Sequence, residues 1–404
     1  MGIASGQQWA SIGIDKVSYP SEPPEPAWLS RERIASVDFW RGVCLLMIFI
    51  DHIPGNPVSY LTLRNWGFVD ASEVFVFLAG FSASLVFDRY FRQGGIICGC
   101  LRVAKRTWEL FRAHVLLVFA LSLIIAVAGT FTDSKPIMEQ MNFSPFFVET
   151  EVAIVRVAKL QYMPNLTDVL PIYVAFIGLF PVLWCLTELS AYAALAASIC
   201  LWAIANITCQ SLPSYPEGAK WFFNPLAWQL MFVLGAILAR RRQTAIVLLQ
   251  SRALLCFAAV IVLAGMVFAA PWTAVEGLSD YRIVPLRFQA INDKANLSPI
   301  RVVHFLAVLV LATYALRPDS KFWKRRLPAV VSTVGRHALP VYCVGVVLAL
   351  MAQISIGIRG SGPLEMISLT ALGLCALVSL AFGLEGAASR LAAVKMPPLP
   401  IGRS

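Results

Sequence analysis

The first strongly apolar stretch of the chain, SVDFWRGVCLLMIFIDHIPGNP, carries an arginine and a histidine at a spacing that suits chemistry. Arg41 and His52 are eleven residues apart, so on an α-helix they lie within about 20° of each other, roughly 16 Å apart along the axis. Asp38 shares this face. Because a charged group inside a membrane loses its water, such a row indicates a functional site. The structural alternative is an Asp38–Arg41 pair near the headgroups, with His52 marking the helix end.

Further charged residues stand where other apolar stretches begin. Asp70 and Glu73 open the second stretch one helical turn apart, Asp168 opens the fourth, and Arg301 and His304 open the eighth. Helix starts favour acidic residues through their free amides and dipole, which accounts for Asp70 and Asp168. That preference does not account for Arg301 or His304. We therefore expect these helix ends to meet in one polar site.

The composition indicates an integral membrane protein. Apolar residues make up 58% of the chain and the mean hydropathy is +0.71, whereas soluble domains have roughly 45 to 50% apolar residues. Runs of about 17 to 25 apolar residues can span a bilayer as helices. The sequence therefore predicts an all-α, polytopic integral membrane protein with about ten transmembrane helices. The predicted spans are residues 37–55, 69–87, 113–131, 168–187, 190–207, 225–239, 252–270, 300–316, 329–354 and 365–388.

Lysine and arginine mark alternate connections between these spans, which predicts the orientation. Basic residues favour the cytoplasmic side of short loops. They gather before the first span and in later even-numbered connections, for example at Arg89, Arg92, Arg240, Arg241 and Lys321. This alternation predicts that both termini are cytoplasmic. It also explains much of the formal charge of +10, so no nucleic-acid partner is needed to account for it.

The domain organisation is predicted to be simple. Residues 1–32 are rich in proline and lack the pattern of a cleaved signal peptide, so we expect a flexible cytoplasmic tail. One transmembrane domain follows over residues 33–390, and residues 391–404 form a cytoplasmic C-terminal tail. Most of the nine cysteines lie within predicted spans, where they act as small apolar residues. Cys98 and Cys100 lack partners at zinc-site spacing, and no metal site is predicted.

Several segments together resemble a known family. The chain resembles the OpgC family, membrane succinyltransferases of osmoregulated periplasmic glucans. Arg41 and His52 also match, more distantly, the arginine–histidine signature of the transmembrane acyltransferase superfamily that O-acetylates bacterial surface polysaccharides. The segments that carry the resemblance are SVDFWRGVCLLMIFIDHIPGNP, FVDASEVFVFLAGFSASLVF, MPNLTDVLPIYVAF, FFNPLAWQLMFVLGA, NLSPIRVVHFLAV and GRHALPVYCVGV.

The resemblance implies an acyltransferase of the bacterial inner membrane, surrounded by membrane lipid. It would transfer a succinyl group from cytoplasmic succinyl-CoA, or another acyl-CoA co-substrate, to glucose hydroxyls of a periplasmic glucan. No tightly bound cofactor is implied. Basic residues on the cytoplasmic side would hold the CoA phosphates, although the positive-inside bias alone also predicts such charges. The residues expected there are Arg102, Lys105, Arg106 and Arg336, with Lys324, Arg325, Arg326 and His337 nearby.

The same resemblance suggests catalytic roles. His52 would act as the base that takes the proton of the attacking sugar hydroxyl, with a transient acyl-histidine as the alternative. Asp51 adjoins His52 but points about 100° away on a regular helix, so Glu73 or Asp70 is the better candidate to orient the imidazole. Arg41 would neutralise an acidic neighbour or steady the thioester.

The remaining polar helix ends would bind the substrate. Arg301 is the candidate partner for the second carboxylate of a succinyl group. Asp51, Asp168 and His304 would contact the glucan. Two outward tryptophans, Trp66 and Trp221, could stack on sugar rings.

Three other functions fit parts of the pattern. An O-acetyltransferase of another periplasmic or surface glycan would use the same residues. A transporter of the glucan or a lipid-linked intermediate would also have ten spans and buried charges. Against it, the two halves show no internal repeat and the charges gather at outer helix ends. A non-catalytic assembly partner in glucan export would have no use for these acid and base residues. The sequence does not indicate an oligomeric state.

Overall fold

The computed structural model describes residues 35–242, 249, 251–269, 291–316, 320–360 and 362–395. Over these residues the chain is helical, and its only β-type pairing is an isolated bridge between Pro213 and Lys220. The prediction of an all-α fold is therefore confirmed. The predicted tail over residues 1–32 lies outside the described residues. At the other end, helix continues to Lys395 and includes the first five residues of the predicted C-terminal tail.

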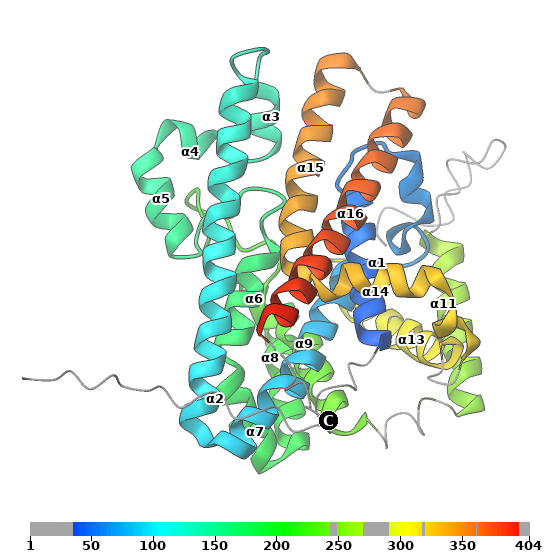
Figure 1. Ribbon diagram of the computed structural model, residues 1–404. Coiled ribbons are helices and arrows are strands. Elements are labelled where there is room, and N and C mark those ends of the chain that lie inside the picture. Colours follow the sequence, from blue (N-terminus) through cyan, green and yellow to red (C-terminus); the bar gives the residue numbers. More distant parts are fainter. Residues whose placement is uncertain are drawn as a thin grey trace, which may run out of the picture.

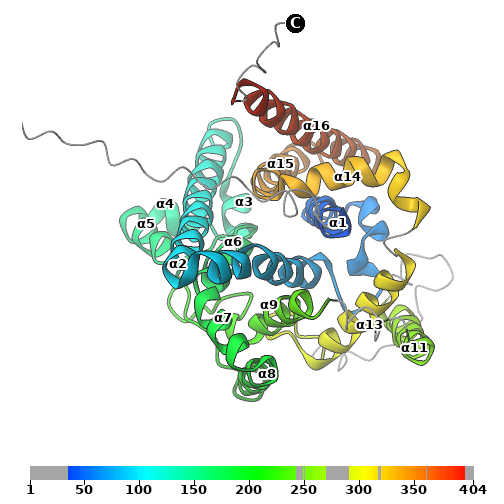
Figure 2. The same cartoon turned by 60° about the horizontal axis from the view of Figure 1, so that its bottom comes forward.

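The first two helices carry most of the predicted site. Helix α1 spans Ala35–Asp51 and is followed by two short 3₁₀ turns, η1 (Pro57–Leu61) and η2 (Leu63–Asn65). Helix α2 spans Ala71–Ala128 and contains both the second and third predicted spans. It changes direction at Gly95, whose φ of 76° lies in the left-handed region that glycine adopts without steric cost. The two arms of α2 diverge from this point (Figures 1 and 2).

Short helices and a bent pair follow α2. Three short helices lie beside one end of the second α2 arm (Figure 1). Helices α6 (Val169–Gly178) and α7 (Phe180–Leu189) meet at a bend of 48°. The bend lies just before Pro181, which cannot donate the backbone hydrogen bond of a continuous helix. The short helices are α3 (Lys135–Gln140), α4 (Ser144–Val148) and α5 (Thr150–Ala158).

The ninth predicted span, residues 329–354, is wrong as a single helix. The chain breaks at His337 into α14 (Arg326–Arg336) and α15 (Ala338–Arg359), and α14 extends sideways from the lower end of the upright α15 and crosses α1 (Figure 1). The charged Arg336 and the polar His337 interrupt the apolar pattern at this break, although residues 329–354 were predicted as one span. The other helices are α8 (Ala191–Thr208), α9 (Pro225–Arg240), α11 (Arg252–Ala269), α13 (Pro299–Ala315), the 3₁₀ turn η4 (Lys321–Lys324) and α16 (Pro363–Lys395).

Glycines bring two pairs of helices into backbone contact. Gly42 and Gly335 lie where α1 crosses α14, and Gly80 and Gly235 lie where α2 crosses α9. A Cβ atom added to any of the four would lie 1.8 to 2.0 Å from a carbonyl oxygen of the facing helix. Small residues permit this close approach between membrane helices. The crossings fix α1 and the first arm of α2, which carry Arg41 and Glu73, in the centre of the bundle.

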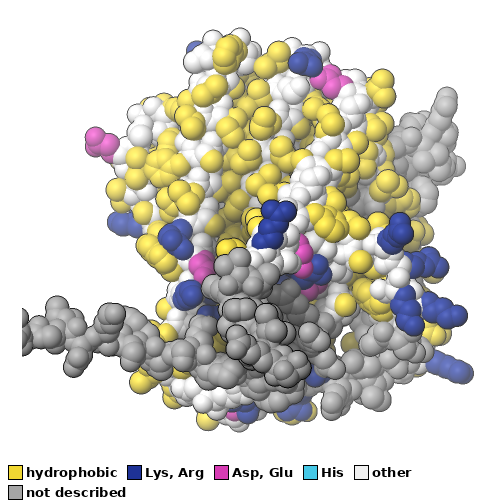
Figure 3. Space-filling model, in the orientation of Figure 1, with side chains coloured by type: hydrophobic (Ala, Val, Ile, Leu, Met, Phe, Trp, Pro, Cys, Tyr) yellow, Lys and Arg dark blue, Asp and Glu magenta, His cyan; other side chains and the backbone are white. Residues whose placement is uncertain are grey.

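The surface and helix lengths are consistent with a membrane protein. Four helices are long and apolar enough to cross a bilayer, and the bent α6–α7 pair would be a fifth. This count does not confirm the ten predicted spans. On the face shown in Figure 3, hydrophobic side chains cover the upper part, and most of the visible lysines and arginines lie around the lower half. Three shorter apolar helices complete the set, namely Pro225–Arg240, Arg252–Phe268 and Pro299–Ala315.

Candidate active site

Two cavities have one lining residue in common, the first residue of α6. Val169 lines both of them. The first, which we call the basic pocket, has a volume of about 510 Å³ and contains Arg41. The second, the His52 pocket, has a volume of about 470 Å³. Because Arg41 lies in the first half of α1 and His52 directly follows its last residue, the two pockets lie toward opposite ends of this helix.

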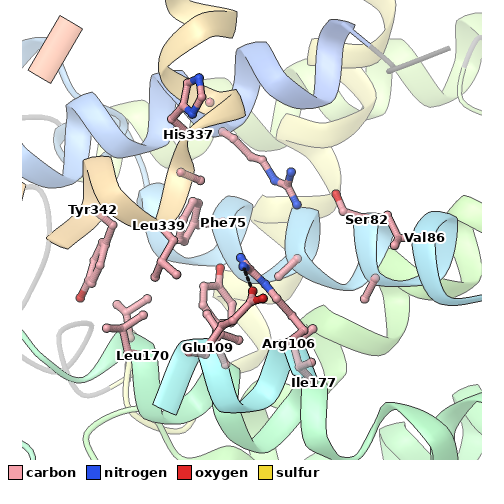
Figure 4. A pocket seen from close by; sticks show the side chains of 18 of the residues that line it. Phe75, Ser82, Val86, Arg106, Glu109, Leu170, Ile177, His337, Leu339 and Tyr342 are labelled. Carbon is pink, nitrogen blue, oxygen red and sulfur yellow. Dashed lines mark hydrogen bonds and ion pairs between the residues drawn. The ribbon is translucent and has the colours of Figure 1, made fainter. Parts of the chain in front are cut away.

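The basic pocket carries a strong positive charge. The second arm of α2 supplies Arg102, Lys105 and Arg106, which share one face of the helix because they are three and four residues apart. Arg106 is paired with Glu109 at 2.9 Å, as the dashed line in Figure 4 shows. Arg336 completes the set from the end of α14. All four residues predicted to bind CoA phosphates thus line one cavity, whereas Lys324, Arg325 and Arg326 do not line it.

The break between α14 and α15 positions two basic residues at this pocket. His337 lies between the two helices, and its Nε2 atom is 2.8 Å from a carboxylate oxygen of Glu385 on α16. Arg336 donates to the same carboxylate from Nε at 3.3 Å and contacts it again from Nη2 at 3.2 Å. Glu385 therefore fixes the direction of both side chains. Figure 4 shows His337 in the wall of the cavity.

Arg41 is only loosely held. Its guanidinium is 4.0 Å from the carboxylate of Asp38, one turn earlier on α1, which is too far for a hydrogen bond. The side chain is 26% exposed and lines the basic pocket. The predicted ion pair with Asp38 is therefore present, but it leaves donor groups of Arg41 available to a ligand.

His52 lies at the wall of the second pocket. Its backbone carbonyl accepts a hydrogen bond from Nε2 of Gln353 at 2.7 Å, which fixes the turn after α1. Its Nδ1 atom is buried and has no hydrogen-bond partner among the described residues. Asp51 accepts a hydrogen bond from the hydroxyl of Thr62 at 2.7 Å. Both Asp51 and His52 line the pocket, and the carboxylate of Asp51 is engaged away from the imidazole.

Glu73 was expected to orient His52, but among the described residues no hydrogen bond joins the two side chains. Glu73 is fully buried and accepts a hydrogen bond from Nε of Arg301 at 2.7 Å. Its second oxygen accepts the backbone N–H of Asp70 at 3.0 Å. A buried carboxylate needs a cation, and Arg301 supplies it from α13. Glu73 does not line either pocket, so it stands behind the site.

Asp70 is likewise engaged by cations. It caps α2 through the N–H of Ser72 at 2.7 Å, and its other oxygen pairs with Nζ of Lys294 and lies 3.6 Å from Nη2 of Arg301. Burial alone would raise the pKa of Asp70, but the charges of Lys294 and Arg301 hold that pKa below its usual range. Asp70 is therefore an anion with fixed partners. It lines the His52 pocket together with Arg301 and Lys294.

Asp168 and His304 have different environments. Asp168 lines the His52 pocket just before α6, and burial raises the pKa of its carboxyl to about 7. His304 lines neither pocket. It is buried, and its imidazole fills the space left by Gly67 and Gly265, where an added Cβ would lie 2.2 and 2.4 Å from the ring. The structure therefore does not place His304 at either pocket, and its contact with substrate stays a prediction.

A family comparison bears on this geometry. A family model described as OpgC protein matches residues 33–388. The chain belongs to the OpgC family. Membership suggests an acyltransferase. No curated protein and no solved structure gave a significant match. The matched segment contains every residue of the two pockets of this OpgC-family protein.

Aromatic side chains of the OpgC-family site differ from the expected ones. Phe68, Phe222 and Phe223 line the His52 pocket, whereas Trp66 and Trp221 do not. The ammonium of Lys294 lies 5.4 Å from the ring centre of Phe223 and 5.9 Å from that of Phe222. The pocket thus combines aromatic faces with carboxylates and cations, which suits a polar ring with many hydroxyl groups.

Three residues of this site were not predicted from the sequence, namely Lys294, Glu385 and Tyr173. Lys294 lies in the connection before α13, where only the neighbouring Asp293 and Asn292 hinted at a polar site. Glu385 lies in the last apolar span, where a lone carboxylate was an available signal. Tyr173 lies within a quoted segment, but its apolar neighbours on α6 gave no indication that it lines a pocket.

Proposed function

We propose that this OpgC-family protein transfers a succinyl group from cytoplasmic succinyl-CoA to glucose hydroxyls of a periplasmic glucan. The observation that carries the proposal is that two chemically different pockets lie on either side of a shared lining residue, Val169. One is cationic and suits a polyanionic donor. The other holds His52, carboxylates and aromatic faces and suits a sugar acceptor.

The basic pocket is the proposed donor site. CoA carries phosphates that cannot enter hydrocarbon, whereas its thioester arm is narrow. Arg102, Lys105 and Arg336 would hold the phosphates, since guanidinium and ammonium groups form charge-assisted hydrogen bonds with phosphate oxygens. The positive-inside pattern of the sequence supports a cytoplasmic location for this pocket. The thioester would then reach inward along α1 toward Arg41.

The His52 pocket is the proposed acceptor site. His52 would take the proton of the attacking hydroxyl, because a neutral imidazole accepts protons at neutral pH. Asp51 and Asp168 offer hydrogen-bond acceptors to other hydroxyl groups of the glucan. Arg301 lines the same pocket and would contact the free carboxylate of the succinyl group, although Glu73 already balances most of its charge.

A direct test measures the substituents on the glucan. Periplasmic glucans would be analysed by mass spectrometry from cells carrying the native chain, His52→Ala or a deletion, with membrane levels of each protein checked. Loss of succinyl-sized mass additions in both mutants, with the amount of glucan unchanged, would support the proposal. A matched control is His114→Ala, because His114 is buried in α2 and lines neither pocket.

The other outcomes are equally informative. Additions of acetyl size would change the donor but keep the reaction class. Additions that survive His52→Ala and vanish on deletion would show that another residue is the base. Disappearance of periplasmic glucan on deletion would contradict acyl transfer and favour export.

A further inference from the structure

Tyr173 carries an unpaired hydroxyl group at the basic pocket. It lies on α6, four residues after Val169, so the two side chains share one face of the helix about one turn apart. Tyr173 lines the basic pocket, and Val169 lines both pockets. The side chain of Tyr173 therefore lines the basic pocket about one helical turn from Val169, the residue shared with the His52 pocket.

Within the part of the chain that the structure describes, the hydroxyl of Tyr173 lacks a hydrogen-bond partner, unlike the hydroxyls of two other buried tyrosines. Tyr173 is 8% exposed, and its hydroxyl oxygen has no hydrogen-bond partner among the described residues. Two other buried tyrosines are satisfied: Tyr342 donates to the carbonyl of Leu166 at 3.0 Å, and Tyr162 donates to the carbonyl of Asn142 at 2.5 Å. Buried phenol groups normally find an acceptor, because an unmade hydrogen bond is costly. The acceptor for Tyr173 is therefore expected to come from a ligand.

Arg41 supplies a second donor in the same cavity. Arg41 and Tyr173 both line the basic pocket. The guanidinium of Arg41 is engaged only by the 4.0 Å contact with Asp38 among the described residues. The one carboxylate among the described residues that line this pocket, that of Glu109, is paired with Arg106. The hydroxyl of Tyr173 thus lies in a cationic cavity and suits an oxygen atom on which negative charge develops.

We propose that Tyr173 is a catalytic residue whose hydroxyl group donates a hydrogen bond to the carbonyl oxygen of the donor thioester as that oxygen becomes an oxyanion. The proposal rests on the acyl transfer proposed above. The acceptor hydroxyl attacks the thioester carbonyl carbon while His52 takes its proton, and a C–O bond forms. The carbonyl oxygen becomes an oxyanion that accepts a hydrogen bond from Tyr173. The intermediate then collapses, the C–S bond breaks, and the CoA thiolate leaves and receives the proton from His52.

The position of Tyr173 suits this role better than donor binding alone. Phosphates would lie beside Arg102 and Lys105 on α2, whereas Tyr173 is one turn from the residue shared with the acceptor pocket. A thioester carbonyl that is to be attacked from the His52 pocket must lie near this shared boundary. The hydroxyl of Tyr173 carries no charge of its own, so it would add little to the binding of a polyanion.

The test compares two tyrosine variants by steady-state kinetics in membrane vesicles. Removal of one oxyanion-hole donor typically lowers kcat by about 10² to 10³-fold. Tyr173→Phe is expected to lower kcat by this factor, with the KM for succinyl-CoA changed less than about threefold. Binding of CoA without an acyl group should stay unchanged. Tyr162→Phe, which removes a buried hydroxyl outside both pockets, should keep the native kcat per folded protein.

A spectroscopic measurement tests the same contact without altering Tyr173. Succinyl-CoA labelled with ¹³C at the thioester carbonyl would be bound to His52→Ala protein, and its infrared carbonyl stretch compared with that in solution. A hydrogen bond donated to the oxygen should shift the stretch to lower wavenumber. An unshifted band would overturn the proposal even if Tyr173→Phe failed to fold.

The outcomes separate this inference from the function on which it rests. No acyl transfer by the native protein would mean that the proposed function fails. Native activity, loss of activity in His52→Ala and a kcat within about threefold of native in Tyr173→Phe would overturn only the oxyanion-hole assignment. A parallel loss of CoA binding in Tyr173→Phe would also overturn it, because the residue would then act in binding or folding.

Discussion

Glu73 and Arg301 form a buried ion pair between α2 and α13, although 228 residues separate them in the chain. The carboxylate of Glu73 is fully buried, and the side chain of Arg301 is 6% exposed. Arg301 also donates to the side chain of Asn292 at 3.0 Å. This pair holds the wall of the His52 pocket, since Arg301 and Asn292 both line it.

Breaking this pair should lower stability strongly. Arg301→Met leaves the carboxylate of Glu73 buried without a cation, which typically costs about 3 to 5 kcal/mol. The double variant with Glu73→Leu removes both charges and should recover most of that loss. Thermal unfolding of the detergent-purified protein would measure both. A double variant no more stable than the single one would contradict the buried-pair account.

Parts of the site were predictable from local sequence. Arg102, Lys105 and Arg106 were assigned to one anion site, and they line one pocket because their spacing along a helix fixes a common face. Arg336 joins them in the same cavity. The all-helical fold followed from composition and from the length of the apolar runs.

Other parts depend on contacts that local sequence does not encode. Glu73 was expected to face His52, but tertiary packing brings it Arg301 as a stronger partner. His304 was expected at the surface of the site, but glycines from two distant segments enclose its ring. The break at His337 coincides with the sequence Gly335-Arg336-His337, but the direction that α14 takes across α1 depends on tertiary packing.

We predict that a larger side chain at one of the glycine crossings destabilises the protein through a steric clash. Gly235→Ala would place a Cβ atom 2.0 Å from the carbonyl oxygen of Phe77, so α9 must move away from α2. Overpacking of this kind costs about 1 to 3 kcal/mol. Gly357→Ala is the matched control, because no heavy atom lies within 4 Å of its added Cβ. Unfolding temperatures of the two variants would be compared, and equal values would contradict the close crossing.

We predict that removing a cation from the basic pocket changes the KM for the acyl-CoA donor but not the KM for glucan. Lys105→Ala removes one cation from the cavity and should raise the KM for acyl-CoA roughly fivefold, the equivalent of about 1 kcal/mol, with the KM for glucan unchanged. The effect should shrink as salt is added, because ions screen the interaction. Kinetics at two ionic strengths would measure this. Arg89→Ala is the control, since Arg89 is on the same helix but lines neither pocket. An equal rise in both variants would indicate a general surface-charge effect.

From the position of Asp168 in the His52 pocket, we predict that the kcat/KM for glucan depends on pH. Burial raises the pKa of its carboxyl to about 7, so much of Asp168 is protonated below neutral pH and becomes a full hydrogen-bond acceptor above it. The native kcat/KM for glucan should therefore rise as the pH increases through about 7. Asp168→Asn keeps the size of the side chain but cannot ionise, so this rise should be absent. Rates would be measured in vesicles from about pH 5.5 to about pH 8.5. Asp133→Asn, outside both pockets, is the control and should keep the native profile. A rise of the same size in Asp168→Asn would assign the titration to another group of the site.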